Sequence, residues 1–509
     1  VESLAICLLF SYATPEHEKR IHRLAQELNI PISAYHRIIP EYREYERTST
    51  TVVNAYVSPL LDRYIGHLEA AIGGSLRIMQ SNGGSISAKV AREEAVRTVL
   101  SGPAAGVVGG FHVAKAAGFS NVITFDMGGT STDVSLCPGE IRTTAESSIA
   151  GCPIRVPMID IHTVGSGGGS IAYLDEGGAL RVGPESAGAD PGPVCYGKGD
   201  RITVTDANLL LGRLDPDSFL GGRMKLDVER AEKAMGRFSR TVGLPPLEVA
   251  EGIVKVANAT MEKAIRVISV ERGFDPREFC LVSFGGAGGL HAFDLAKSLS
   301  IPQVLIPLNA GLLSAYGMLV ADVVKDYSRS ILIPSKEAPF EKLRELFRPL
   351  TERGLCEMRE EGIPERRVRC FYFLDMRYIG QSYELTVPFT REYIARFHAL
   401  HRQVYGSAKP EKDTEVVNLR LRVVGGTGKP VLPEVEEGSS DASSALLGER
   451  KVLYEGRWLQ AKLYDRQILK AGNVILGPAV IVEPTATTFL PPDGLLRVDR
   501  FGNLLLSHV

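Results

Sequence analysis

The chain has 509 residues, of which 44% are hydrophobic and 23% charged, and its formal net charge is −2. This length predicts two to four domains rather than one core, and the near-zero charge excludes an electrostatic argument for nucleic acid or an anionic membrane as partner. The seven cysteines contain no Cys-x-x-Cys pair, a pattern that favours reduced thiols in the cytoplasm over disulfides or a zinc site. No apolar run reaches the roughly 18 residues that cross a bilayer.

The first hundred residues alternate strand and helix patterns, which indicates an α/β fold. Residues 4–10 predict a strand, and residues 15–28 a helix with Thr14 as N-cap. Apolar residues at helical spacing predict a long helix over 49–71, with Pro59 as a kink. A further strand at 30–33, a strand with its turn at 76–84, and a small-residue helix over 101–117 complete this part.

The most informative stretch is the octet Asp-Met-Gly-Gly-Thr-Ser-Thr-Asp at 126–133, which lies between two apolar runs. This pattern predicts two strands joined by a glycine-rich turn. Backbone N–H groups and hydroxyls of the turn can form a nest for phosphate, and Asp126 at the strand end can hold Mg²⁺. A tight hairpin in which Gly-Gly serves only the turn geometry is the alternative.

Two more glycine-rich segments follow. The segment 160–170 carries Asp160 and His162, and the second, at 284–291, lies between a predicted strand and a predicted helix. A strand–turn–helix context places backbone N–H groups at a helix N-terminus, which is an anion-binding geometry. His162 and His291 both lie in these glycine loops, where each can orient a substrate or move a proton, or else hold its loop by a hydrogen bond.

The remainder of the chain changes character near residue 330. Helices are predicted over 228–242 and 246–272 and a charged helical stretch over 336–363, whereas short strands and turns dominate after residue 416. His398 and His401 share a helix face, but no further ligands accompany them, so solvated or capping roles are favoured over metal binding. A serine-hydrolase elbow, a P-loop and a Rossmann fingerprint are absent from the sequence.

Taken together, these motifs resemble the hydantoinase A / 5-oxoprolinase family, which contains ATP-dependent hydantoinase and N-methylhydantoinase A subunits, 5-oxoprolinase, and related subunits of acetone and acetophenone carboxylases. The resemblance spans nearly the whole chain. The segments that carry it are 81–84, 101–103, 126–133, 160–170, 183–193, 205–208, 284–291 and 477–483.

The resemblance implies an α/β fold with an acetate kinase/Hsp70/actin-like (ribonuclease H-like) ATPase core. Such cores bring two glycine hairpins to the phosphates, and no hairpin of that kind precedes Asp126. We therefore expect an N-terminally incomplete core, either a fragment or a split subunit. The expected domains are a remnant of the N-terminal half at 1–48, the ATPase-like core at 49–330 and a C-terminal β-rich α+β domain at 331–509.

The resemblance also assigns residues. Asp126 would address Mg²⁺, and the glycine turn would hold the β- and γ-phosphates of ATP. The nucleotide-binding residues implied are Gly128, Gly129, Thr130, Ser131, Gly167, Gly168, and, on the adenosine or α-phosphate side, Gly285, Gly286 and Gly288. The catalytic candidates are Asp126, Asp160, His162 and Asp206.

The implied function is that of a cytoplasmic subunit of an ATP-dependent cyclic-amide hydrolase (hydantoin, N-methylhydantoin or 5-oxoproline type) that phosphorylates the amide oxygen for ring opening. A B-type subunit is the expected partner in a hetero-oligomer, with ATP and Mg²⁺ as cofactors. One alternative is a carboxylase-type subunit that phosphorylates a ketone enol and bicarbonate, and another is a non-catalytic nucleotide-binding regulator.

Overall fold

The computed structural model describes residues 1–145, 147–149 and 151–509, and contacts divide them into two units. Unit 1 comprises Val1–Gly102, Thr143–Ile159 and Ala321–Lys429, and unit 2 comprises Pro103–Arg142, Asp160–Val320 and Pro430–Val509. Each unit therefore joins segments that are distant in the sequence. These units cut across the expected boundaries at 48 and 330, and the division into three consecutive domains stays a prediction.

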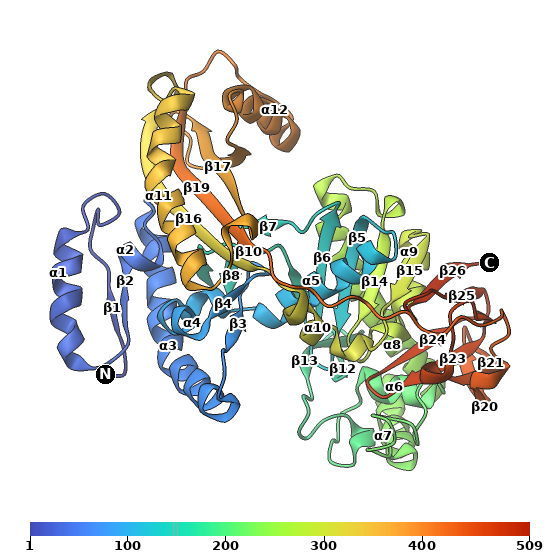
Figure 1. The fold of residues 1–509 in the computed structure, drawn as a ribbon. Coiled ribbons are helices and arrows are strands. Elements are labelled where there is room, and N and C mark those ends of the chain that lie inside the picture. The colour runs from blue at the N-terminus through green and yellow to red at the C-terminus, as the bar shows by residue number, and fades with distance from the viewer. Residues whose placement is uncertain (146, 150) are drawn as a thin grey trace. The chain divides into compact units, whose positions relative to one another are not determined.

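Unit 2 is built on an eight-stranded mixed sheet (Figure 1). Its strand order is β11 (His162–Val164), β6 (Thr132–Pro138), β5 (Asn121–Met127), β14 (Cys280–Phe284), β15 (Gln303–Ile306), β26 (Leu504–His508), β25 (Gly494–Val498) and β22 (Val474–Leu476). The central strands β5, β14 and β15 run parallel, and β6 pairs antiparallel with β5. The hairpin predicted at residues 122–136 is thereby confirmed.

Helices and smaller sheets complete unit 2. Its helices are α5 (Ser101–Ala116, which begins in unit 1), α6 (Val204–Leu210), α7 (Val228–Val242), α8 (Pro246–Ile268), α9 (Ala292–Leu299) and α10 (Leu313–Val320). A Cβ atom at Gly106 would lie 2.8 Å from the Phe284 ring, so the small residues of α5 allow it to pack closely on β14. The remaining strands are β12 (Ser170–Leu174) paired with β13 (Leu180–Ser186), and the sheet β20 (Leu446–Tyr454), β21 (Arg457–Asp465), β23 (Ala479–Glu483) and β24 (Ala486–Leu490).

Unit 1 contains a six-stranded sheet in the order β18 (Leu385–Pro388), β17 (Val368–Tyr378), β19 (Thr414–Gly425), β16 (Val323–Pro334), β4 (Ser85–Ser87) and β3 (Arg77–Met79). Helix α11 (Phe340–Glu360) lies along this sheet (Figure 1), and the core between them includes Phe347, Leu374 and Leu419. The other elements are α1 (Glu16–Ala25), α2 (Tyr35–Ile38), α3 (Glu44–Ile72), α4 (Ala88–Glu93), α12 (Tyr393–Tyr405) and the strand pairs β1 (Leu4–Ile6) with β2 (Ile32–Ala34), β7 (Thr143–Thr144) with β10 (Met158–Ile159), and β8 (Ser147–Ile149) with β9 (Cys152–Ile154).

The first strand and the long helix of unit 1 differ in length from the expectation. The first strand ends at Ile6 rather than at residue 10, because Phe10 adopts a left-handed conformation (φ 57°) and its carbonyl accepts the N–H groups of Ala13 and Thr14 in a turn. The long helix begins at Glu44, five residues before the expected start, and Pro59 lies inside it. Within the described residues, no helix is long and apolar enough to cross a membrane.

Candidate functional site

The turn between β5 and β6 presents backbone donors without internal partners. The Gly128 N–H donates to the Ser131 carbonyl and closes the turn. Among the described residues, the N–H groups of Gly129 and Thr130 donate no hydrogen bond, and both residues are exposed. Exposed, convergent N–H groups on a tight turn are the donors that an anion nest requires, so the turn is suited to bind phosphate oxygens.

The second glycine loop supports this turn from behind. The N–H of Gly168 donates to the Gly128 carbonyl at 3.0 Å, and that of Gly169 donates to the Gly129 carbonyl at 2.6 Å. A Cβ atom at Gly167 would lie 2.7 Å from the Thr130 backbone. Glycine is thus required at Gly167 by the close approach of two backbones. Of the two predicted binding residues, Gly168 lines a cavity of unit 2 and Gly167 does not.

Asp126 shares one face of the sheet with an acidic residue that the sequence assignment omitted. Asp126 pairs with Asp133 across β5 and β6, and Asp133 pairs with Thr163 of β11. The Thr163 hydroxyl donates to Asp133 at 2.5 Å, whereas the described residues give the Asp126 carboxylate no hydrogen bond or ion pair. Burial and the neighbouring Asp133 raise the pKa of Asp126 to about 7, and burial also raises the pKa of Asp133.

Two neighbouring carboxylates without a counter-charge fit a divalent cation. Mg²⁺ is typically held by one or two carboxylates together with water and phosphate oxygens, and Asp126 with Asp133 supplies such a pair beside the phosphate-type turn. The described residues contain no group of three or more His, Cys, Asp or Glu side chains that would enclose an ion by themselves. The donor set therefore suits an ion that arrives with a nucleotide.

The turn after β14 adjoins the same place. Gly285 adopts φ +78°, and a Cβ atom there would lie 2.5 Å from the Asp126 carboxylate. The Ala287 N–H donates to the Met127 carbonyl and links this turn to β5, while the Gly286 N–H has no partner among the described residues. Gly288 is buried, and a Cβ atom there would lie 2.7 Å from the Ser283 hydroxyl. Gly286 thus offers a donor to a ligand, whereas Gly285 and Gly288 allow close packing.

A cavity of about 200 Å³ in unit 2 connects these turns to an apolar region. Gly128, Gly129, Gly168 and Gly286 line its polar part. The rest of the lining was not predicted from the sequence: it includes Tyr196, Phe219, Leu214, Leu290 and Thr485. The rings of Tyr196 and Phe219 lie 5.6 Å apart, and such an aromatic pair is suited to a planar base. No spacing in the sequence connects these residues, because they come from four separate segments.

Asp206, a predicted catalytic residue, is fully buried and holds local structure. It forms a capping box with Thr203 at the start of α6. Its carboxylate also accepts the backbone N–H groups of Val194 at 3.2 Å and Cys195 at 2.8 Å. These contacts join α6 to the preceding loop, and we infer that Asp206 is a positioning residue whose oxygens are already engaged. Its catalytic role stays a prediction.

We expect Asp206→Ala to lower the free energy of unfolding by about 3 kcal/mol, because several buried donors lose a charged acceptor. Chemical denaturation followed by circular dichroism measures this. Asp200→Ala, which removes an exposed carboxylate six residues earlier, is the matched control and should change stability by less than about 0.5 kcal/mol. Equal stability of the two variants would contradict the positioning role.

Asp160 and His162 lie apart from the Asp126 carboxylate. Asp160 forms an ion pair with Arg272, and its carbonyl accepts the Ser135 hydroxyl at 2.8 Å. His162 pairs with Val134 in the register that pairs Thr163 with Asp133. Since alternate residues of a strand face opposite sides, His162 faces away from Asp126 and Asp133. The acid–base roles of Asp160 and His162 stay predictions without a contact to the glycine turns.

His291 is fully buried between two asparagines, with Nδ1 at 2.6 Å from Asn258 Oδ1 and Nε2 at 3.3 Å from Asn208 Nδ2. Burial and Arg213 lower its pKa to about 3, so the ring is neutral and holds its loop. These contacts favour a structural role for His291 over substrate orientation or proton transfer. In unit 1, His401 Nδ1 likewise contacts the Ser407 carbonyl at 2.6 Å, and His398 contacts the Tyr378 hydroxyl.

The structure is that of an α/β protein whose glycine turns lie at the ends of its central strands. The hydantoinase/oxoprolinase family model matches residues 47–327, and the model of the hydantoinase/oxoprolinase C-terminal domain matches residues 334–508. The chain belongs to the hydantoinase/oxoprolinase family. The family resemblance drawn from the motifs is thereby confirmed.

Similar proteins include members with different activities. Caprolactamase subunit alpha of Pseudomonas jessenii is 37% identical, with 98% of this chain and 75% of that protein covered. 5-Oxoprolinase 1 of Arabidopsis thaliana is 34% identical, with 100% of this chain and 42% of that protein covered. The crystal structure of the ATP-dependent caprolactamase from P. jessenii superposes with a TM-score of 0.88 (36% identity; 99% of this chain, 77% of that chain).

The nucleotide-free structure of acetone carboxylase is also similar, with a TM-score of 0.81 and 29% identity over 100% of this chain and 76% of that chain. This chain is therefore similar both to hydrolases of cyclic amides and to a ketone carboxylase. Its α/β fold is shared with both.

Proposed function

We propose that this chain is the nucleotide-binding subunit of an ATP-dependent hydrolase of cyclic amides, built on an ATPase core of the acetate kinase, Hsp70 and actin type. The observation that carries the proposal is the turn at Gly128–Ser131, whose unpartnered N–H groups lie beside the Asp126–Asp133 carboxylate pair. The name of the caprolactamase relative supports ATP use with a lactam, and that of 5-oxoprolinase supports a cyclic amide.

The chemistry requires activation of a poor electrophile. Phosphorylation of the amide oxygen gives an imidate-like species that water can open, and phosphoryl transfer depends mainly on positioning and charge neutralisation. In the proposal, the N–H groups of Gly129 and Thr130 and the hydroxyls of Thr130 and Ser131 hold phosphate oxygens. Gly286 contributes a donor on the nucleoside side, and the Tyr196–Phe219 wall receives the base.

Asp126 and Asp133 are the proposed ligands of Mg²⁺, which when bound would neutralise charge on the phosphates. The pKa of Asp126 near 7 describes the carboxylate without a cation. A bound cation favours the ionised carboxylate and lowers this pKa. The site therefore prefers to bind metal and nucleotide together, and binding should weaken as the pH falls below about 7.

A carboxylase-type subunit is the second candidate, because the acetone carboxylase structure is similar over the whole chain. The glycine turns serve phosphorylation of an amide and of a ketone enol equally. For either reaction we propose a companion subunit of the hydantoinase B type, because the similar caprolactamase chain is named as a subunit. A non-catalytic nucleotide-binding regulator would share the turns but would not require Asp126.

In the protein assembled with its partner subunit, we expect a cyclic amide to stimulate ATP hydrolysis at least 10-fold. The assay compares caprolactam, 5-oxoproline and hydantoin with acetone plus bicarbonate, and it measures ADP release and ring-opened product. The Asp126→Asn variant is the control for turnover at this site. Turnover that depends only on ketone and bicarbonate would contradict the cyclic-amide hydrolase and support the carboxylase-type subunit.

A further inference from the structure

Unit 1 contains a second cavity, of about 170 Å³, whose lining residues are all distinct from those of the nucleotide-type cavity. Its floor is the face of the six-stranded sheet opposite α11. In the register of this sheet, Ser328 of β16 and Phe373 of β17 both pair with Arg420 of β19, and Asp326 pairs with Arg422. Alternate residues face one side of a sheet, so these side chains share the floor.

The lining is cationic, with four arginines (Arg97, Arg155, Arg420 and Arg422) against two carboxylates (Glu41 and Asp326). Both carboxylates are already engaged. Asp326 accepts from Arg422 Nε at 2.7 Å and Nη2 at 3.3 Å. Glu41 pairs with Arg420 at 3.0 Å and with Arg155 at 3.2 Å. The lining thus has no carboxylate left for another cation.

Three of the lining arginines have guanidinium nitrogens without a hydrogen bond in the part of the chain that the structure describes. Arg155 is 7% exposed, and its Nη1 atom is buried without a partner. Arg97 donates through Nε to Glu94 and through Nη2 to the Asp326 carbonyl, and Arg422 donates through Nε and Nη2 to Asp326, so the Nη1 group of each is free. An unmade bond to a buried charged donor costs free energy, which favours an acceptor in this cavity.

The motif Ser81–Gly84 contributes to this arrangement. Asn82 Nδ2 donates to Asp326 at 2.8 Å, and Asn82 Oδ1 accepts the Gly84 N–H at 2.9 Å. A Cβ atom at Gly84 would lie 2.4 Å from the Val324 side chain, so only glycine allows this turn to approach β16. The motif thereby holds Asp326, which in turn orients Arg422.

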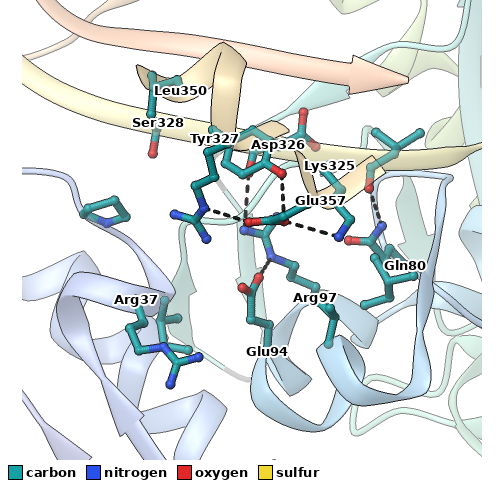
Figure 2. Close-up of a pocket in the computed structure, with 16 residues that line it drawn as sticks. Arg37, Gln80, Glu94, Arg97, Lys325, Asp326, Tyr327, Ser328, Leu350 and Glu357 are labelled. Carbon is teal, nitrogen blue, oxygen red and sulfur yellow. Dashed lines mark hydrogen bonds and ion pairs between the residues drawn. The ribbon is translucent and has the colours of Figure 1, made fainter. Parts of the chain in front are cut away.

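A smaller neighbouring hollow of about 60 Å³ provides a contrast. Figure 2 shows its charges paired with one another: Glu357 lies between Lys325 and Tyr327, at 3.2 Å and 2.8 Å, and Arg97 lies beside Glu94. Arg97 lines both hollows, and this network engages its Nε and Nη2 atoms but not its Nη1 atom. The free donors instead belong to residues of the larger cavity, where Ile38, Val156 and Phe373 add apolar lining.

We propose that the larger cavity binds a small organic monocarboxylate with an apolar body. Planar guanidinium groups match a carboxylate in shape and charge, and the apolar lining receives the hydrocarbon part. The ligand would carry one anionic end only, because neither lining carboxylate is free to bind an amino group.

Calorimetric titration of the full chain with hexanoate, hexanamide and inorganic phosphate tests the proposal. We expect hexanoate to bind, and the neutral hexanamide and phosphate to bind at least 10-fold more weakly. Arg97→Gln should weaken hexanoate binding about 10-fold or more. Arg329→Gln, on the same strand as Ser328 but exposed, is the matched control and should leave the affinity unchanged.

Phe373→Trp retains every charge but reduces the cavity, and it should weaken hexanoate binding even if Arg97→Gln fails to fold. Circular dichroism checks the fold of each variant. Lack of hexanoate binding to the wild type, tighter binding of phosphate than of hexanoate, or equal affinity in a folded Arg97→Gln or Phe373→Trp variant would each overturn the proposal.

Discussion

Asp126→Asn is expected to reduce ATP turnover at least 1000-fold and at the same time to stabilise the protein without nucleotide at pH 8. The loss of turnover follows from the proposed role of this carboxylate in holding Mg²⁺. The gain in stability follows from its environment, since Asp126 lies beside Asp133 and has no hydrogen bond or ion pair among the described residues. A carboxylate that binds a ligand and does not stabilise the fold should show both the loss of turnover and the gain in stability when it is replaced.

The pH dependence has a definite sign. Because the pKa of Asp126 is raised from 3.8 to about 7, the folded state holds a proton that the unfolded state releases between these values. The wild type therefore loses stability as the pH rises from about 4 through 7. A shift of about three pKa units corresponds to about 4 kcal/mol, and we expect about half of it because the side chain still meets solvent.

Thermal unfolding of both proteins at pH 4 and pH 8 measures this effect. The two melting temperatures should nearly coincide at pH 4, and the variant should melt several degrees higher at pH 8. Added Mg²⁺ with ADP should raise the Tm of the wild type alone. In Asp133→Asn the fall in stability should occur at lower pH, because burial alone then raises the pKa of Asp126 and the smaller contribution of the Asp133 charge is removed. A variant less stable than the wild type at pH 8 would contradict this account.

Gly285→Ala is expected to lower the free energy of unfolding by about 3 kcal/mol and turnover at least 100-fold. Alanine at φ +78° costs roughly 1–2 kcal/mol. Its Cβ atom would also lie 2.4 Å from the Met127 carbonyl oxygen and 2.5 Å from the Asp126 carboxylate, so the carboxylate must move. Denaturation and steady-state ATPase assays measure the two effects.

Gly286→Ala is the matched control in the next position. Its Cβ atom would have no neighbour closer than 3.4 Å, its φ lies outside the left-handed region, and its N–H group is retained. We expect a change in stability below about 1 kcal/mol. If the two alanine variants were equally destabilised, the close contact with Asp126 could not be the reason for glycine at residue 285.

Local patterns were sufficient to predict the glycine turn but not its surroundings. The hairpin followed from two apolar runs and an octet between them, because strand and turn preferences act over a few residues. The second carboxylate, Asp133, was part of the quoted octet, yet its position opposite Asp126 depends on strand register. The same register places His162 on the face of the sheet opposite Asp126 and Asp133. The position of His162 two residues after Asp160 did not indicate this.

The contacts that Asp206 makes in the folded chain favour a structural role, and the sequence could not show these contacts. In the sequence, an acidic residue at a helix start is compatible with capping and with catalysis alike. Only the folded chain brings Val194 and Cys195 to its carboxylate. The aromatic wall at Tyr196 and Phe219 depends in the same way on loops that converge in space.

The sequence by itself determined the α/β class, the family, and the glycine turn with Asp126, since each is encoded in contiguous residues. Tertiary structure decided which groups meet: Asp133 with Asp126, Gly168 with Gly128, and both Asn82 and Arg422 with Asp326. The reason is physical. Turn geometry and strand preference depend on neighbours along the chain, whereas charge pairing, burial and cavities depend on contacts that each unit forms between distant segments.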